Sequence, residues 1–185
     1  QTQFVFGVEG LKNIDINRFS LRALSIILGG GMSSRLFQEI REKKGLCYSI
    51  FSFTQMQNSS GVFGFYAGTS PKDVDYLLES SLTELKKIKN FISTEELNRA
   101  KAQMKSGFIM GHESNSSRSE YFAKNMINFG KIIGTDEIIA SIEKISINSI
   151  YDLCDKLLTS ANPVLSVIGP DANSLKKLDI STMLN

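Results

Sequence analysis

This sequence has few histidines, few cysteines and a small net charge, and each of these features argues against a class of function. His112 is the one histidine among 185 residues, and a catalytic zinc site usually needs two or three imidazoles. Cys47 and Cys154 stand far apart, so they make no disulfide framework and favour a reducing compartment. A formal net charge of +2 is too small to argue for binding to nucleic acid or to an anionic membrane.

Long apolar runs and processing signals are lacking too. No run approaches the roughly 18 residues that a membrane-spanning helix needs. The first eight residues, Gln-Thr-Gln-Phe-Val-Phe-Gly-Val, are typical of a strand rather than of a secretory signal. Because no methionine begins the sequence, we expect a piece of a longer protein. A hydrophobic content of 42%, with no internal repeat and no long linker, predicts a single domain over residues 1–185.

Apolar periodicity predicts strands early in the chain and mostly helices after them. Strands are expected over residues 3–8, 46–55, 62–67 and 164–168. Helices are expected from Asp15 or Asn17 to Gly29, from Ser33 or Ser34 to Gly45, from Ser70 onward, from the Ser93 capping box onward, and over about 118–129, 136–145 and 147–158. A turn over 58–61 joins the second and third strands as a hairpin. The expected fold is therefore α+β, a mostly antiparallel sheet covered by helices on one face.

Alternation along residues 46–55 predicts which side chains enter the core. Cys47, Phe51 and Phe53 fall on one face of this strand, and Tyr48 falls on the other. Cys47 is therefore interpreted as a small core residue and not as a nucleophile. A sheet covered on one side has a free face, and Tyr48 is a candidate to stand on it.

Three segments invite a functional interpretation but lack the residues that it requires. His112-Glu-Ser-Asn-Ser has no second histidine at zinc-binding spacing, so His112 is interpreted as a solvated or capping residue near a helix end. The run Gly29-Gly30-Gly31 follows a helix and lacks the Lys-Ser of a phosphate loop, which favours a flexible reversal between two helices. Phe63 and Phe65 have no RNA-binding signature around them and are better explained as core.

Arg41 and Tyr48 form a further candidate pair. Arg41 lies late in the second expected helix, beside its apolar face, and Tyr48 lies at the start of the next strand. A turn at Gly45 between them can bring the guanidinium and the phenol to the same side of the sheet. On spacing alone, such a pair is more often structural than functional.

The tract around this pair resembles a known signature. It begins at Leu28, ends at Ile50 and reads Leu-Gly-Gly-Gly-Met-Ser-Ser-Arg-Leu-Phe-Gln-Glu-Ile-Arg-Glu-Lys-Lys-Gly-Leu-Cys-Tyr-Ser-Ile. It is similar to the signature of the inverted zinc peptidases, a superfamily that includes pitrilysin, the insulin-degrading enzyme and the mitochondrial processing peptidase. There the signature belongs to the half without the metal, and Arg41, Leu46 and Tyr48 match its Arg, Leu and Tyr. Looser similarity covers nearly the whole chain.

The resemblance implies roles for individual residues. Arg41 and Tyr48 would contact the substrate backbone near the scissile bond. Gly29, Gly30 and Gly31 would form a mobile loop near the substrate chamber, an alternative that the sequence does not separate from a plain reversal. The domain alone would hold no metal ligand and no catalytic residue. Zinc would be bound in the full enzyme by the other half, where a Glu activates the zinc-bound water.

The resemblance also implies a function for the whole chain. It would be the substrate-binding, chamber-forming domain of a zinc-dependent endopeptidase similar to the mitochondrial processing peptidase, inactive by itself. Its partners would be an N-terminal zinc-binding half or a partner subunit and a peptide substrate, in a homodimer or heterodimer. A cytoplasmic location is expected, with the mitochondrial matrix or the periplasm as alternatives.

Two other functions stay open at this point. One is a non-catalytic structural subunit of the same superfamily, similar to the core proteins of the respiratory cytochrome complex. Such subunits tend to lose the Arg–Tyr pair, which is present here. The other is an unrelated α+β binding domain, which would leave the tract after Leu28 unexplained.

Overall fold

The computed structural model describes residues 1–159, 162–170 and 175, and its strands form one antiparallel sheet. The strands are β1 (Thr2–Glu9), β2 (Cys47–Met56), β3 (Gly61–Thr69) and β4 (Val164–Ile168). Their order across the sheet is β2-β3-β1-β4, and every neighbouring pair runs antiparallel. Within the described residues, β2 and β4 are therefore the edge strands.

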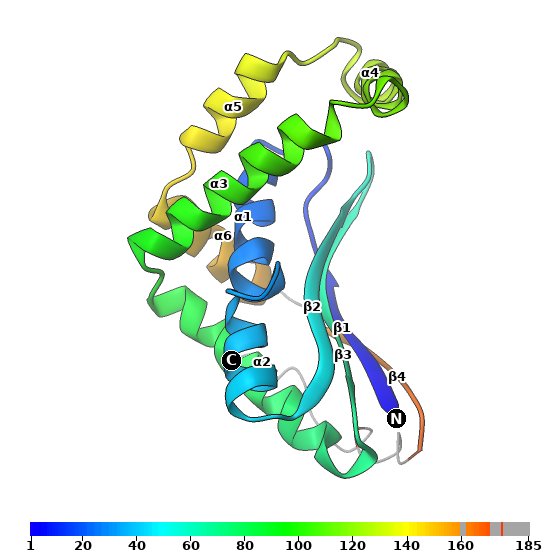
Figure 1. Cartoon of the computed structure of the whole chain (residues 1–185), viewed down its shortest axis with the longest axis vertical. Helices are drawn as coiled ribbons and strands as arrows, with labels where there is room; N and C mark the ends of the chain where they lie inside the picture. The colour runs from blue at the N-terminus through cyan, green and yellow to red at the C-terminus, as the bar shows by residue number, and fades with distance from the viewer. Residues whose placement is uncertain (160–161, 171–174, 176–185) are drawn as a thin grey trace.

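Helices lie on one side of this sheet (Figure 1). They are α1 (Arg18–Gly29), the π-helix η1 (Leu36–Lys43), the short 3-10 helix η2 (Pro71–Asp73), α2 (Val74–Asn90), α3 (Thr94–Gly111), α4 (Asn115–Phe129), α5 (Thr135–Glu143) and α6 (Ile147–Thr159). The expected α+β architecture, with a helical layer on one face, is confirmed. No helix in the described part of the chain has the length and apolarity to cross a membrane.

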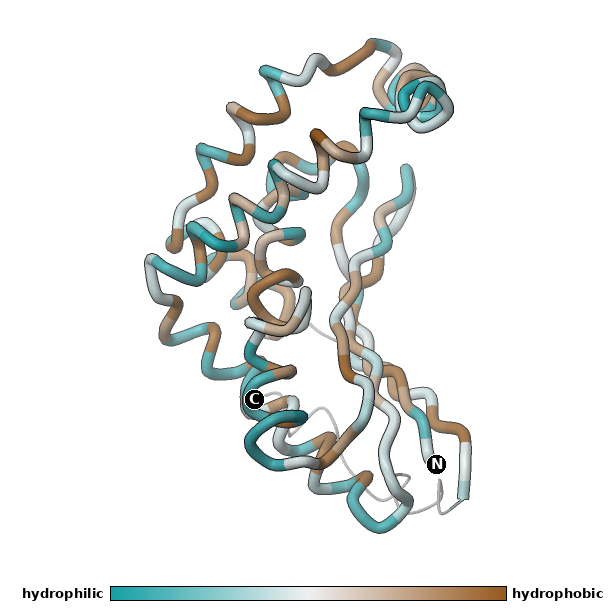
Figure 2. The backbone as a smooth tube through the Cα atoms, viewed as in Figure 1, coloured by the Kyte–Doolittle hydropathy of each residue, from teal (hydrophilic) through white to brown (hydrophobic). Residues whose placement is uncertain are grey.

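The core lies between the sheet and the helices. Phe4, Phe6, Phe63 and Phe65 point inward from β1 and β3 and are at most 1% exposed. The rings of Phe6 and Phe65 stack with their centroids 5.0 Å apart. Both layers contribute hydrophobic segments to this interface (Figure 2). The prediction that Phe63 and Phe65 are core residues is confirmed.

The opposite face of the sheet carries apolar side chains with no helix over them in the described residues (Figure 1). Val5, Phe51 and Ile168 are 37%, 46% and 73% exposed. The Phe51 ring lies 5.0 Å from the ring of Tyr66 on the neighbouring strand. An exposed apolar face without a covering helix can serve as a surface that contacts another protein element.

The predicted facing of strand β2 is wrong for the residues that follow Tyr48. Cys47 pairs with Thr69 and Ser49 pairs with Gly68, so Tyr48 is an extra residue in a β-bulge. An extra residue reverses the alternation of all the residues that follow it. Cys47 is inward as expected, but it shares the core face with Ile50, whereas Phe51 and Phe53, predicted on the Cys47 face, lie on the outer face.

Candidate functional site

The π-helix η1 places Arg41 beside β2. Leu36 and Ile40 are fully buried and fix the inner face of this helix, so Arg41, the next residue, lies on its flank. The helix ends where the Leu46 amide donates to the Ile40 carbonyl at 3.1 Å and Gly45 adopts a φ of +63°. Only the type of this helix differs from expectation. A π-helix is rare and frequently occurs at functional sites.

The structure brings Arg41 and Tyr48 together. The guanidinium carbon of Arg41 lies 4.5 Å from the centre of the Phe37 ring and 5.4 Å from the centre of the Tyr48 ring. A cation–π contact uses none of the guanidinium N–H donors in a conventional hydrogen bond. Its one charged contact in the described chain is with Glu42, at 3.8 Å. Tyr48 is 80% exposed, and its hydroxyl has no hydrogen bond to any described residue.

The glycine run between α1 and η1 is a closely packed reversal. A Cβ at Gly29 would lie 2.4 Å from the Ser52 amide nitrogen, and Gly31 has a φ of +145°. Side chains hold the loop as well, because Gln103 Nε2 donates to the Gly30 carbonyl at 2.7 Å and Ser34 Oγ donates to the Gly31 carbonyl at 2.6 Å. Close packing at Gly29 and the positive φ of Gly31 explain why glycines stand at these two positions. A mobile role for this loop near a substrate stays a prediction.

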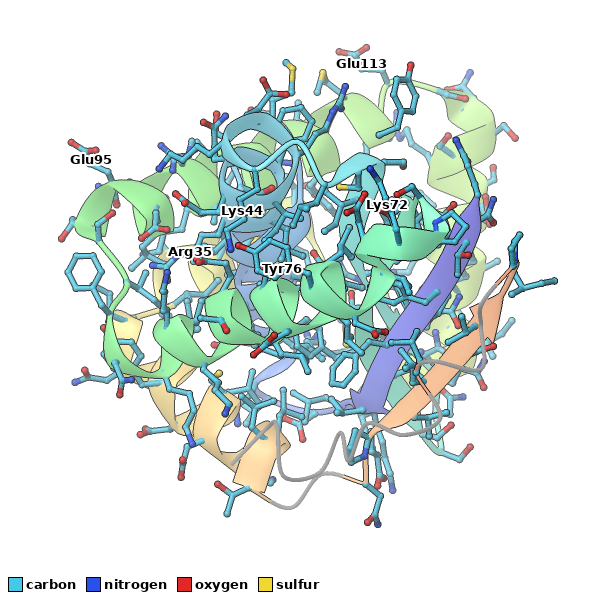
Figure 3. The ribbon with its side chains drawn as sticks, turned by 90° about the horizontal axis from the view of Figure 1, so that it is seen from below. Arg35, Lys44, Lys72, Tyr76, Glu95 and Glu113 are labelled. Carbon is cyan, nitrogen blue, oxygen red and sulfur yellow. The ribbon has the colours of Figure 1, made fainter. Side chains whose placement is uncertain are left out.

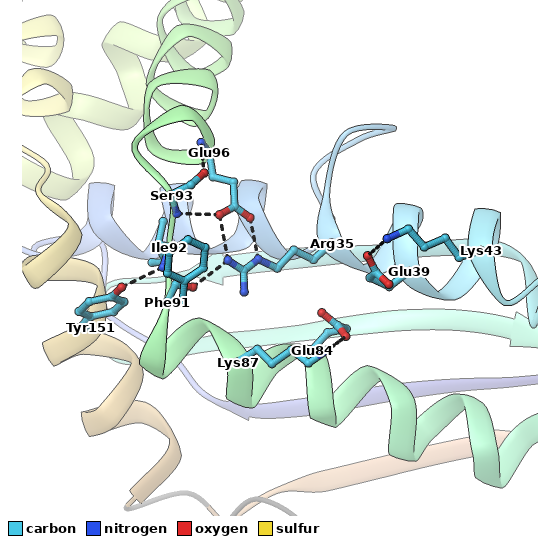
Figure 4. Close-up of polar contacts among 10 residues, drawn as sticks. All are labelled: Arg35, Glu39, Lys43, Glu84, Lys87, Phe91, Ile92, Ser93, Glu96 and Tyr151. Atoms are coloured by element: carbon cyan, nitrogen blue, oxygen red, sulfur yellow. Dashed lines mark hydrogen bonds and ion pairs between the residues drawn. The ribbon is translucent and has the colours of Figure 1, made fainter.

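An ion pair that sequence reasoning missed ties the start of η1 to α3 (Figure 4). Arg35 donates from Nε to Glu96 Oε1 at 2.6 Å and from Nη2 to Glu96 Oε2 at 2.9 Å and to the Phe91 carbonyl at 2.7 Å. The two side chains are 13% and 16% exposed. The capping box Ser93–Glu96 identifies this carboxylate in the sequence, but its partner stands 61 residues away.

The electrostatics of Glu96 favour the ionised form. Burial by itself raises the pKa of this carboxyl, but hydrogen bonds from Arg35 and Ser93 outweigh the burial, so the pKa is lowered from its ordinary value. At the other end of η1, Lys44 lies over the Tyr76 ring at 4.8 Å and donates to Ser80 Oγ at 2.8 Å (Figure 3). The helix that carries Arg41 is therefore held at both ends.

His112 has a structural environment. It is the C-cap of α3, and its Nδ1 lies 2.7 Å from the Phe108 carbonyl, so the capping interpretation is confirmed. Its ring packs against Phe108 and Tyr121 at 4.1 and 4.4 Å between centroids. Nowhere in the described residues do three His, Cys, Asp or Glu side chains gather as a metal site would require.

Both cysteines are buried thiols. Cys47 is 9% exposed and Cys154 is fully buried. Burial raises the pKa of Cys47 to about 11 and that of Cys154 to about 12. Because the thiolate is the reactive form, neither side chain is suited to act as a nucleophile near neutral pH.

We expect both native thiols to react slowly with a disulfide reagent at about pH 8 and rapidly after unfolding in guanidinium. The unfolded chain loses these protons above about pH 8.5 while the native chain keeps them, so the free energy of unfolding should fall as the pH rises further. Absorbance of the released thiolate measures the first effect, and denaturant unfolding at several pH values measures the second. Equal reaction rates for native and unfolded chains would contradict the conclusion that both thiols are buried and have raised pKa values.

Comparison with known proteins places the chain among peptidases. A family model described as "Peptidase M16 inactive domain" matches residues 1–104, which include the glycine run, η1 and β2. A protein of Rickettsia felis described as an uncharacterized zinc protease is 38% identical over 172 residues, which are 92% of this chain and 42% of that protein. The chain thus spans less than half the length of this relative.

Solved structures share the fold. A protease from Helicobacter pylori superposes with a TM-score of 0.83 at 24% identity, over 91% of this chain and 41% of that chain. A chain of complex III2 from Candida albicans superposes with a TM-score of 0.85 at 20% identity, over 100% of this chain and 46% of that chain. At these identities the likeness concerns the fold alone. Because the family match covers more than half of the sequence, the chain belongs to the peptidase M16 inactive domains, a part of a zinc-protease family.

Proposed function

We propose that this chain is the substrate-binding, chamber-forming half of a zinc-dependent endopeptidase similar to the mitochondrial processing peptidase. The other half would hold zinc and supply the water that attacks the peptide. The observation that carries the proposal is the contact between Arg41 and Tyr48, whose polar groups are left largely unused by the described chain. An exposed, pre-positioned set of donors is what a peptide carbonyl requires.

The chemical role of the pair follows from its donors. A guanidinium and a phenol can donate to a carbonyl oxygen that gains negative charge as water adds to the carbon. Contacts of the guanidinium with the Phe37 and Tyr48 rings would hold it near the phenol before the peptide arrives. Tyr48 is the bulge residue at the start of an edge strand, so an extended peptide that pairs with β2 would pass the phenol.

A second half is part of the proposal. The Rickettsia felis relative is more than twice as long as the matched region, which leaves room for an N-terminal zinc-binding half in the same protein or in a partner subunit. The uncovered apolar face around Val5, Phe51 and Ile168 is a suitable contact surface for such a half, in a homodimer or a heterodimer. The two unpaired cysteines favour a cytoplasmic location for the assembly.

A complementation experiment tests whether this chain supplies substrate binding and the other half supplies the zinc site. The isolated chain is expected to hydrolyse no peptide, and addition of the separately prepared zinc-binding half is expected to restore hydrolysis. An Arg41→Ala chain should restore much less, while Arg118→Ala, a change at an exposed arginine on α4, should restore as much as the wild type. Peptidase activity of the isolated chain with stoichiometric zinc, or full restoration by Arg41→Ala, would contradict the proposal.

A further inference from the structure

A continuous cleft lies far from Arg41 along β2. Two adjoining cavities of about 820 and 570 Å³ open between α1, the second half of β2 and the helices α3 to α5. They share their central lining residues, Asn13, Phe19, Arg22, Met56, Phe108 and Ile138. In Figure 1 these elements meet around the end of the sheet where β2 finishes.

The charges in this cleft have one sign. Its charged lining residues are Arg18, Arg22 and Lys124, and no described carboxylate lines either cavity. Lys124 pairs with Glu120 on the exposed surface of α4. A nearby acid, Glu137, is paired with Lys131 at 3.4 Å. The cleft therefore carries positive charge that the described chain does not neutralise.

Arg22 is the least satisfied of these cations. Arg18 donates to the Asp15 carbonyl at 3.2 Å and lies 4.6 Å from the centre of the Phe19 ring, whereas Arg22 has no hydrogen bond or ion pair with any described residue. Arg22 is exposed by its accessible surface, but it lines both cavities and has many protein atoms around it, and Arg18 stands one helical turn away. Burial and this like charge lower the pKa of Arg22. An anion would relieve both effects.

The side chains that line the cleft indicate which kind of anion it would bind. Phe19, Phe108 and Phe129 give it an aromatic lining, which suits a ligand with apolar groups beside its charge. The edge strand β2 enters the cleft at residues Ser52 to Met56 and begins beside Tyr48 at its other end. A peptide extended along that edge from Tyr48 to Thr54 would cover about 20 Å at roughly 3.3 Å per residue.

We propose that this cleft binds the carboxylate of an acidic residue in an extended peptide, with Arg22 as the anchoring guanidinium and Arg18 beside it. A carboxylate accepts two parallel hydrogen bonds from a guanidinium, which a lysine ammonium does not match. The inference rests on the proposed function insofar as the peptide is the substrate. The cleft would select an acidic residue about six positions from the bond held at Arg41 and Tyr48.

Fluorescence anisotropy with labelled peptides tests the site on the 185-residue chain and on the longer protein. One peptide carries a single Glu between apolar residues, and its matched control carries Gln instead. We expect the Glu peptide to bind more tightly, and Arg22→Gln to weaken its binding about ten- to hundredfold and to remove the Glu–Gln difference. Arg118→Gln should change neither. Because Arg22→Gln removes a repulsive charge without opening a core cavity, its melting temperature should not fall.

The outcomes separate the cleft from the Arg41–Tyr48 site. Three results would overturn the proposed carboxylate site. They are equal binding of the two peptides to the wild type, unchanged binding of the Glu peptide to Arg22→Gln, and equal displacement of both peptides by inorganic phosphate. A Glu preference that depends on Arg22 but persists in Tyr48→Phe supports it. If Tyr48→Phe and Arg41→Ala keep wild-type kinetics while that preference persists, the cleft stands and the proposed function fails.

Discussion

Tyr48→Phe in the peptidase assembled as proposed is expected to lower kcat about ten- to hundredfold, because one hydrogen bond to a developing charge is worth roughly 1.5–3 kcal/mol. The melting temperature should not change, since the hydroxyl is exposed and has no partner in the described chain. Steady-state kinetics with a peptide substrate measure the effect. Tyr76→Phe is the matched control, because that tyrosine is also exposed and lies under a cation, Lys44.

Arg41→Ala should raise KM as well as lower kcat, because a guanidinium that contacts the bound peptide acts in the ground state too. This change also removes the cation that contacts the Phe37 and Tyr48 rings, so it frees the phenol to turn away. The double mutant Arg41→Ala/Tyr48→Phe is therefore expected to lose less than the sum of the two single losses. Wild-type kcat/KM in both single mutants would show that the pair is only structural.

Glu96→Gln is expected to lower the free energy of unfolding by about 2–3 kcal/mol, because it leaves a mostly buried Arg35 without its charged acceptor. Replacement of both partners, as in Arg35→Met/Glu96→Leu, should cost less than Glu96→Gln, since no unpaired charge remains. Denaturant unfolding measures both. Glu120→Gln is the matched control on an exposed pair with Lys124, where little change is expected.

The pH dependence of this ion pair has a definite sign. Hydrogen bonds from Arg35 and Ser93, which outweigh burial, lower the pKa of Glu96, so the native state favours its ionised form. The stabilisation is fully present above the unfolded carboxyl value of about 4.3 and is lost as the pH falls below it. The difference in unfolding free energy between the wild type and Glu96→Gln should therefore shrink on acidification. A difference that stays constant down to about pH 3 would contradict the assignment.

Loss of the Arg35–Glu96 ion pair is also expected to lower activity, because it affects the helix that carries Arg41. Arg35 immediately precedes η1, so a chain without the Arg35–Glu96 contact holds the start of that helix less firmly. If the Arg35→Met/Glu96→Leu protein remains folded at the assay temperature, its kcat/KM should still fall, because Arg41 is carried on η1. Wild-type kinetics in that folded protein would limit the ion pair to a role in stability.

Local patterns in the sequence determined the elements and their layers. Alternating apolar residues predicted the strands that contain Phe4 and Phe65, and the Ser93 capping box marked the start of α3. These features depend on residues within a few positions of one another, which is why they can be predicted without the fold. The spacing of Arg41 and Tyr48 was also visible, but its functional meaning came from resemblance to a peptidase signature.

Tertiary structure alone decided how the candidate sites are built. Whether Tyr48 is an ordinary strand residue or a bulge depends on how its neighbours Cys47 and Ser49 pair with Thr69 and Gly68, which a separate strand supplies. The Arg35–Glu96 ion pair joins residues 61 positions apart, and the cleft around Arg22 exists only when α1, β2 and α3 to α5 come together. Local periodicity records which residues are buried, but it does not record which distant residue stands opposite, because that is set by packing of the whole chain.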